Sequence, residues 1–154
     1  MEDIRFGPAT AADLPEVRML LDRCELPSAD LQPGHLGHFV LCRVGDSLAG
    51  SVGLEVIADI GLLRSLAVAP GLRRRGLAHD LWRRVQARAR DQGIRRLYLL
   101  TTTAEPLFAR WGFQRVARDV VPEAIRATAE FGTLCPSTAA VMVMDLATAG
   151  IRGS

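Results

Sequence analysis

The sequence predicts a single α/β domain, and three observations lead to that class. Apolar runs with the length of buried strands recur along the chain, at 39–44, 48–57, 62–68, 97–100 and 139–146. Short links join the first three runs, which predicts antiparallel neighbours, whereas a helical segment joins 62–68 to 97–100 and predicts a parallel pair. With 154 residues, of which 49% are apolar and 23% charged, the chain can bury one core without metals or disulfides.

The N-terminal part combines an edge strand, a helix and a loop. The strand is expected over 4–6. Thr10, with Asp13 three residues later, has the spacing of a helix N-cap. Pro and Gly residues over 26–37 predict a loop or a short helix. Between the cap and this loop, apolar residues recur at helical spacing, at Leu14, Val17, Leu20 and Leu21.

The stretch from 62 to 78 organises the rest of the chain. Its apolar strand is expected to end at Pro70 and Gly71, since Pro lacks a backbone donor and Gly relaxes the backbone. Three arginines and Gly76 then lead into a helix, whose apolar stripe is formed by Leu77, Leu81, Val85 and Ala89. A turn with free amides before a helix N-terminus, flanked by arginines, predicts a cradle for the oxygens of a pyrophosphate.

The C-terminal third is expected to add two helices and further strands. The threonines at 101–103 can cap a helix over 104–111, and a strand follows over 113–117. Pro122 suits the first turn of another helix, which is expected to continue through Phe131. The last apolar run then provides the final strand.

Composition and charge exclude several classes of protein. The domain is expected to occupy residues 1–146, followed by a flexible tail over 147–154. A net charge of +2 does not demand a nucleic-acid partner, and no apolar run reaches membrane-spanning length, so the chain is expected to be cytoplasmic. Three cysteines without a C-x-x-C pair predict a reducing compartment and no metal site, and they are Cys24, Cys42 and Cys135.

Two motifs, in this order, carry a family resemblance. Arg73, Gly76 and Ala78 form an R-x-x-G-x-A signature, and residues 104–113 fit the pattern A-x-x-[FL]-[FY]-x-[RK]-x-G-F. With both motifs in place, the chain resembles the GNAT family of N-acetyltransferases over most of its length. The segments 62–68, 98–105 and 130–139 further resemble the N-acetyltransferases that are encoded beside arsenic-resistance genes.

This resemblance implies both a fold and a cosubstrate. The fold is a mixed, mostly antiparallel sheet with helices on both faces, in which the parallel strands 62–68 and 97–100 splay apart at their C-terminal ends. Acetyl-CoA is implied to insert there and to pair with the first of these strands, and no metal is involved. The implied cofactor contacts are Leu66, Ala67, Val68, Arg73, Arg74, Arg75, Gly76, Leu77, Ala78, Ala104, Phe108 and Arg110.

Acetyl transfer from a thioester to an amine needs an oxyanion donor, a base and an acid. The resemblance implies the amide of Val68 as the oxyanion donor. Glu55 is the best carboxylate available as base, directly or through water, unless it faces solvent in an alternating strand. Phe108 stands where the family has an acid tyrosine and cannot donate a proton. Tyr98 suits strand packing better, so Thr101, water or the acceptor itself would protonate the thiolate.

Arg64 is unusual because an arginine inside an apolar strand is costly to bury unpaired. It either pairs with a carboxylate, such as Glu55 or Asp59, or binds an anionic group of the acceptor. Acetyltransferases of this fold place the loop at 26–37 over the acceptor, so its polar residues are either acceptor contacts or ordinary surface residues. The residues concerned are Asp30, His35 and His38 in or next to this loop, and the other candidate substrate contacts are Arg64, Ser65, Thr101 and Thr102.

The sequence therefore predicts an acetyl-CoA-dependent N-acetyltransferase that acts on the primary amine of a small molecule. The finer resemblance points to an amino-bearing organoarsenical or a related toxic amino acid analogue. An ordinary amino acid, a polyamine and a protein N-terminus are the alternative acceptors. A non-catalytic acyl-CoA-binding module is the alternative from another class, and the phenylalanine at the tyrosine position favours it. The strands at the two ends of the chain could also pair between two copies in a homodimer, because edge strands expose unpaired backbone groups.

Overall fold

The computed structural model describes residues 3–134 and 137–146. Its strands are hydrogen-bonded in the order β1-β2-β3-β4-β5-β7-β6, a seven-stranded mixed sheet. The chain forms two compact units, one made of residues 1–55 and 64–88 and the other of residues 56–63 and 89–154. Strand β4 (Ile60–Val68) runs from the second unit into the first.

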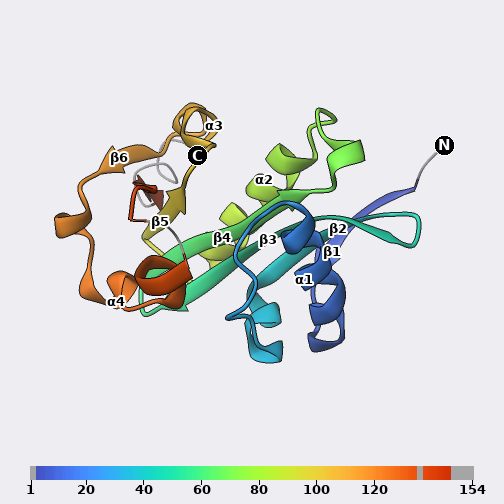
Figure 1. The fold of residues 1–154 in the computed structure, drawn as a ribbon, viewed down its shortest axis with the longest axis horizontal. Coiled ribbons are helices and arrows are strands. Elements are labelled where there is room, and N and C mark those ends of the chain that lie inside the picture. Colours follow the sequence, from blue (N-terminus) through green and yellow to red (C-terminus); the bar gives the residue numbers. More distant parts are fainter. Residues whose placement is uncertain (1–2, 135–136, 147–154) are drawn as a thin grey trace. The chain divides into compact units, whose positions relative to one another are not determined.

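The first unit contains an antiparallel meander and two long helices (Figure 1). Strand β1 pairs with β2 and β2 pairs with β3, both antiparallel, and the β2–β3 turn places Gly45 at φ +60°. A β-bulge between Cys42 and Arg43 shifts the second pairing by one residue. The elements of this unit are β1 (Ile4–Pro8), η1 (Ala11–Asp13), α1 (Leu14–Arg23), η2 (Pro33–His38), β2 (Phe39–Val44), β3 (Ser47–Ile57), η3 (Pro70–Leu72) and α2 (Leu77–Asp91).

Helices cover both faces of this part of the sheet, as predicted. Two glycines of β3 show this, because residues three positions apart in a strand face opposite ways. A Cβ on Gly50 would lie 2.9 Å from Leu81 Cδ1 of α2. A Cβ on Gly53 would overlap the ring of Phe39, which belongs to the core under α1. Glycine at these two positions therefore lets α2 approach one face and an aromatic ring fill the other.

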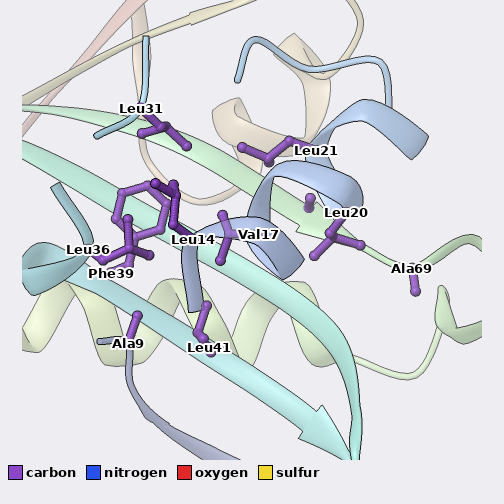
Figure 2. Close-up of a cluster of buried hydrophobic side chains, with 11 residues drawn as sticks. Ala9, Leu14, Val17, Leu20, Leu21, Leu31, Leu36, Phe39, Leu41 and Ala69 are labelled. Atoms are coloured by element: carbon purple, nitrogen blue, oxygen red, sulfur yellow. The ribbon is translucent and has the colours of Figure 1, made fainter. Parts of the chain in front are cut away.

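The core of the first unit lies between α1 and the sheet. Figure 2 shows the apolar side chains of α1 directed toward the strands, with Leu14 and Leu36 beside the ring of Phe39. Phe39 is fully buried. The predicted apolar stripe of α1 is confirmed, and η2 and the preceding loop contribute to the same core. Its buried members are Ala9, Leu14, Val17, Leu20, Leu21, Leu31, Leu36, Phe39, Leu41, Ala67 and Ala69.

The second unit is built on the parallel pair of β4 and β5 (Arg96–Thr101). Residues Ile60–Leu62 pair with Arg96–Tyr98, which confirms the predicted parallel arrangement, and both strands continue beyond these pairs. Strand β7 (Ala140–Asp145) is antiparallel to β5 and to β6 (Gln114–Val116). The expectation that the last strand is an edge is thus wrong, since β7 lies between two others. The core of this second unit contains Leu62, Tyr98, Val121, Ile125 and Val141.

The helix expected from Pro122 to Phe131 does not form as one piece. A short helix, α4, covers Glu123–Arg126, and a π-helical turn, η5, covers Glu130–Leu134. Thr128 explains the interruption, because its hydroxyl donates to the carbonyl of Ile125 at 2.7 Å and accepts from the amide of Phe131 at 3.3 Å. Such side-chain bonds to the local backbone compete with helical ones.

Other predicted elements differ only at their ends. Helix α3 covers Glu105–Arg110, and the strand expected over 113–117 is the shorter β6. The short helical turn η4 (Arg118–Val120) was not predicted. The predicted thiol at Cys135 and the predicted tail, 147–154, lie outside the described residues. No helix in the described ranges is both long and apolar enough to cross a bilayer.

Candidate active site

Strand β4 is irregular at Ser65, which has φ +59° although it is not a glycine. This left-handed backbone interrupts the alternation of side chains along the strand, as a β-bulge does. Arg64 and Ser65 are both buried, and the Nε of Arg64 donates to the Oγ of Ser65 at 3.0 Å. The carbonyl of Ser65 accepts from the Oγ of Ser51 at 2.7 Å, which anchors the irregular position to β3. The bulge therefore holds two consecutive polar side chains together inside an apolar strand.

Arg64 is the centre of a buried ion network. Its Nη1 donates to Asp30 Oδ2 at 2.5 Å and to Glu55 Oε2 at 3.1 Å. Its Nη2 donates to Asp30 Oδ1 at 2.8 Å and to the carbonyl of Pro27 at 3.4 Å. The Arg64 side chain has no exposed surface, while those of Asp30 and Glu55 are 14% and 19% exposed. Of the alternatives that the sequence left open for Arg64, the structure shows pairing with Glu55, and Asp30 is a second partner.

The network changes the titration of Asp30. Burial alone raises the pKa of this carboxyl, but the hydrogen bonds and the positive charge of Arg64 outweigh burial and hold the pKa below its ordinary value. Asp30 is therefore ionised at neutral pH, and with Glu55 it gives Arg64 two carboxylate partners. One buried cation between two carboxylates leaves the cluster with an excess of negative charge.

The carboxylate of Glu55 is partly buried, and one of its two oxygens accepts a hydrogen bond. Its side chain keeps 19% of its surface exposed, so it is neither fully buried nor freely solvated. Among the described residues its Oε2 has Arg64 as its hydrogen-bond partner, and its Oε1 has none. Glu55 therefore has one oxygen without a hydrogen-bond partner among the described residues, which a base needs if it is to accept a proton.

The C-terminal end of β4 is tied to the turn that follows it. The carbonyl of Val68 accepts from the Nε of Arg73 at 3.1 Å and from the thiol of Cys24 at 3.6 Å. The Nη2 of Arg73 also lies 3.5 Å from the sulfur of Cys24. Arg73 thus folds back onto the strand and fixes the start of the turn, a role that the sequence did not indicate.

The predicted anion cradle has an unusual backbone. Arg74 has φ +68° and Gly76 has φ +78°, and α2 begins at Leu77. Two left-handed residues within three positions form a tight turn, and backbone amides of turns can make a concave site for an anion. A Cβ on Gly76 would meet nothing within 4 Å, so glycine is needed there for its backbone conformation. The amides of the first turn of α2 extend the same donor set.

The second unit holds the remaining predicted contacts. Thr101 Oγ1 accepts a hydrogen bond from the amide of Ala104 at 2.9 Å, so this threonine helps to shape the start of α3. Thr102 and Arg110 are exposed. Phe108 is buried, with its ring edge-on to Trp111 at 5.5 Å and to Phe113 at 5.8 Å. Phe108 is a packing residue of this unit.

Tyr98 is likewise buried, in the core of the second unit, which agrees with the packing role expected from the sequence. Cys42 is fully buried, and burial together with the carboxylate of Asp80 raises the pKa of its thiol. The residues that the structure describes contain no cluster of three or more potential metal ligands.

The comparisons with known proteins agree with this geometry. Residues 8–113 match the model of the Acetyltransferase (GNAT) family. The amino-acid acetyltransferase of Neisseria meningitidis is 32% identical over 126 residues, which are 80% of this chain and 28% of that protein. The amino-acid acetyltransferase of Ectopseudomonas mendocina is 39% identical over 67 residues, 44% of this chain and 16% of that protein. The chain thus spans less than a third of the length of these relatives.

Solved structures give the same fold. N-acetylglutamate synthase from Neisseria gonorrhoeae, complexed with coenzyme A and N-acetyl-glutamate, has a TM-score of 0.80 and 26% identity over 94% of this chain and 35% of that chain. Rv2747 from Mycobacterium tuberculosis, in complex with CoA and NLQ, has a TM-score of 0.75 and 24% identity over 92% of this chain and 98% of that chain. At that identity the second likeness concerns the fold alone.

Proposed function

Because the chain belongs to the GNAT acetyltransferase family, we propose that it transfers the acetyl group of acetyl-CoA to the amine of a small molecule of the amino-acid class. One observation of the structure supports acetyl-CoA as the cosubstrate. The left-handed residues Arg74 and Gly76 open the N-terminus of α2 inside the R-x-x-G-x-A motif. Their backbone amides and the helix dipole suit the pyrophosphate of CoA.

The residues of β4 and α2 supply the rest of the proposed cosubstrate site. The backbone of Leu66–Val68 would pair with the pantetheine arm, and the amides of 74–78 would hold the pyrophosphate. The thioester of acetyl-CoA supplies the activated acetyl group. The amide of Val68 would donate to the acetyl carbonyl oxygen as negative charge develops there.

Glu55 is the proposed base. Its Oε1, which has no hydrogen-bond partner among the described residues, would take a proton from the acceptor ammonium, and the carboxylates of Asp30 and Glu55 favour a cationic amine there. Phe108 supplies no acid, so the thiolate would be protonated by Thr101, by water or by the proton that the acceptor releases.

The acceptor class follows from the relatives. Those named above are amino-acid acetyltransferases, and one structural relative is an N-acetylglutamate synthase. They favour an ordinary amino acid over the amino-bearing organoarsenical that the finer resemblance suggests, and they give that subgroup no support. The buried Phe108 favours the other candidate, a non-catalytic acyl-CoA-binding module.

Thiol release from acetyl-CoA tests this proposal, with glutamate, other amino acids, a polyamine and an amino-bearing organoarsenical as acceptors. Release that depends on an amino acid is the expected result. The variant E55Q should lower kcat by about 100-fold or more, because it removes the base. E16Q is the matched control, since Glu16 is also a carboxylate paired with an arginine, Arg43, and should leave kcat unchanged. Tight CoA binding without release for any acceptor would favour the binding module.

A further inference from the structure

Asp30 and Glu55 come from distant parts of the first unit and meet at one guanidinium. Asp30 lies in the loop before η2, while Glu55 lies near the end of β3. We propose that Asp30 is a positioning residue that acts through Arg64 to orient Glu55. This inference rests on the proposed function, because it gives Glu55 the acceptor's proton.

The hydrogen bonds fix the guanidinium at three points of its plane. Asp30 takes one hydrogen each from Nη1 and Nη2, at 2.5 Å and 2.8 Å, in the bidentate geometry that suits a carboxylate. Ser65 takes the Nε hydrogen at 3.0 Å from the other edge. Because two edges of the guanidinium are held, the second hydrogen of Nη1 can point in one direction only. The Oε2 of Glu55 accepts this hydrogen at 3.1 Å. Asp30 therefore determines where Glu55 is held.

The charges lead to the same conclusion. Arg64 shares one positive charge between two carboxylates, so each is neutralised only in part. If Asp30 lost its charge, the whole attraction of Arg64 would fall on Glu55, and the guanidinium would no longer be held against a second carboxylate. Among the described residues Glu55 forms an ion pair with Arg64, and the charges that lower the pKa of Asp30 are those of Arg64 and His35.

Burial separates this role from direct binding of the acceptor. The Arg64 side chain has no exposed surface, whereas Glu55 keeps 19% of its own. An anionic group of the acceptor could reach Arg64 only by displacing one of the groups that accept its hydrogen bonds, which include Asp30, Glu55, Ser65 and Pro27. Asp30 and Glu55 are exposed to a similar degree, 14% and 19%. Both oxygens of Asp30 accept from Arg64, whereas Glu55 accepts through one, so Glu55 is the carboxylate with an oxygen left for an acceptor.

The variant D30N tests this role in the full chain, with acetyl-CoA and the acceptor that gives release in the wild type. Asparagine keeps the size of the side chain and removes its charge. We expect kcat to fall about tenfold and the acceptor KM to stay within about twofold. The acidic limb of the kcat/KM profile should lose the contribution of Asp30, whose pKa lies below its ordinary value. D30E should restore part of kcat, because it returns the charge on a longer arm.

D13N is the matched control, since Asp13 pairs with Arg43 in the same unit and on the surface. It should change neither kcat nor the pH profile. CoA affinity, measured by calorimetry, reports that each variant is folded. If D30N does not fold, R64K replaces it, because lysine keeps the charge but cannot hold both carboxylates in one plane, and the same loss of kcat is expected.

Two results would overturn the inference while the proposed function stands. An active D30N with unchanged kcat and pH profile would make Asp30 a structural residue only. A rise of the acceptor KM alone would instead make the Asp30–Arg64 pair part of the acceptor site. Absence of acceptor-dependent release in the wild type would overturn the proposed function itself, and the inference with it.

Discussion

Two arginines of the first unit each stand between two carboxylates, and they differ in their surroundings. Arg43 of β2 contacts Asp13 and Glu16 at the start of α1, with its Nη2 at 2.9 Å and 3.0 Å from their oxygens. Its side chain is 24% exposed, and those of its partners are 21% and 49% exposed. Arg64 lies 2.5 Å and 3.1 Å from its two carboxylates through Nη1, and its side chain is completely buried.

The difference shows that the number of ion pairs says little about their importance. Water reaches the Arg43 side chain, which is 24% exposed, and that of Glu16, which is 49% exposed, when the pairs break. Pairs that are open to water contribute only about 0–1 kcal/mol. Arg64 has no such alternative, and it also donates to the hydroxyl of Ser65 and to the carbonyl of Pro27. A buried charge that loses a partner is left without solvation, so the buried cluster should be far more sensitive to substitution.

Replacing each arginine by methionine should give the largest contrast. R64M is expected to lower the free energy of unfolding by about 3–5 kcal/mol, because it leaves two mostly buried carboxylates without a countercharge. R43M should cost about 1 kcal/mol or less. Urea titration of both variants at pH 7 measures the difference. Equal losses would show that burial does not distinguish the two clusters.

Acid should weaken the buried cluster through Asp30. The pKa of this carboxyl is lower in the folded protein than in the unfolded chain, so its pairing stabilises the fold above about pH 3.9, and the contribution disappears as the pH falls through the folded value. Wild type should exceed D30N by about 2 kcal/mol in free energy of unfolding at pH 7.

Urea titrations at a series of pH values from 7 downward measure this gap. It should narrow steadily below about pH 4. A gap that stayed constant down to the acid transition would mean that Asp30 stabilises the fold by its size or packing and not by its charge.

Salt should distinguish the clusters by a smaller amount. A double-mutant cycle on Arg43 and Glu16 is expected to lose a few tenths of a kcal/mol of coupling between about 0.1 M and 1 M sodium chloride, because mobile ions screen exposed charges. The same cycle on Arg64 and Asp30 should change less, since ions cannot approach a side chain without exposed surface. A stronger salt response of the buried pair would contradict its burial in solution.

Local patterns in the sequence predicted α1, α2 and α3, because these helices depend on neighbouring residues. The residues predicted as the apolar stripe of α2, such as Leu81 and Val85, are buried. The Pro70–Gly71 break and Gly76 likewise mark the end of β4 and the left-handed turn before α2. In each case the signal lies within a few positions of its effect.

Features that depend on distant residues could not be predicted in this way. Asp30 is 34 positions from Arg64, and several carboxylates could have served as the partner equally well from sequence alone. The place of β7 between β5 and β6 depends on pairing across the sheet. The break at Thr128 arises because its hydroxyl donates a hydrogen bond to the local backbone instead of to water.

Phe39 and Gly53 face each other across β2 and β3, and the ring occupies the volume that a side chain at 53 would need. The residue that is accepted at either of these positions therefore depends on the residue at the other. A larger residue at 53 becomes acceptable only after position 39 has given up its ring, and a smaller residue at 39 leaves a hole that only a change at 53 can fill. Related chains that differ at one of these positions should also differ at the other. A chain with only one of the two changes should be destabilised, by steric overlap or by a cavity.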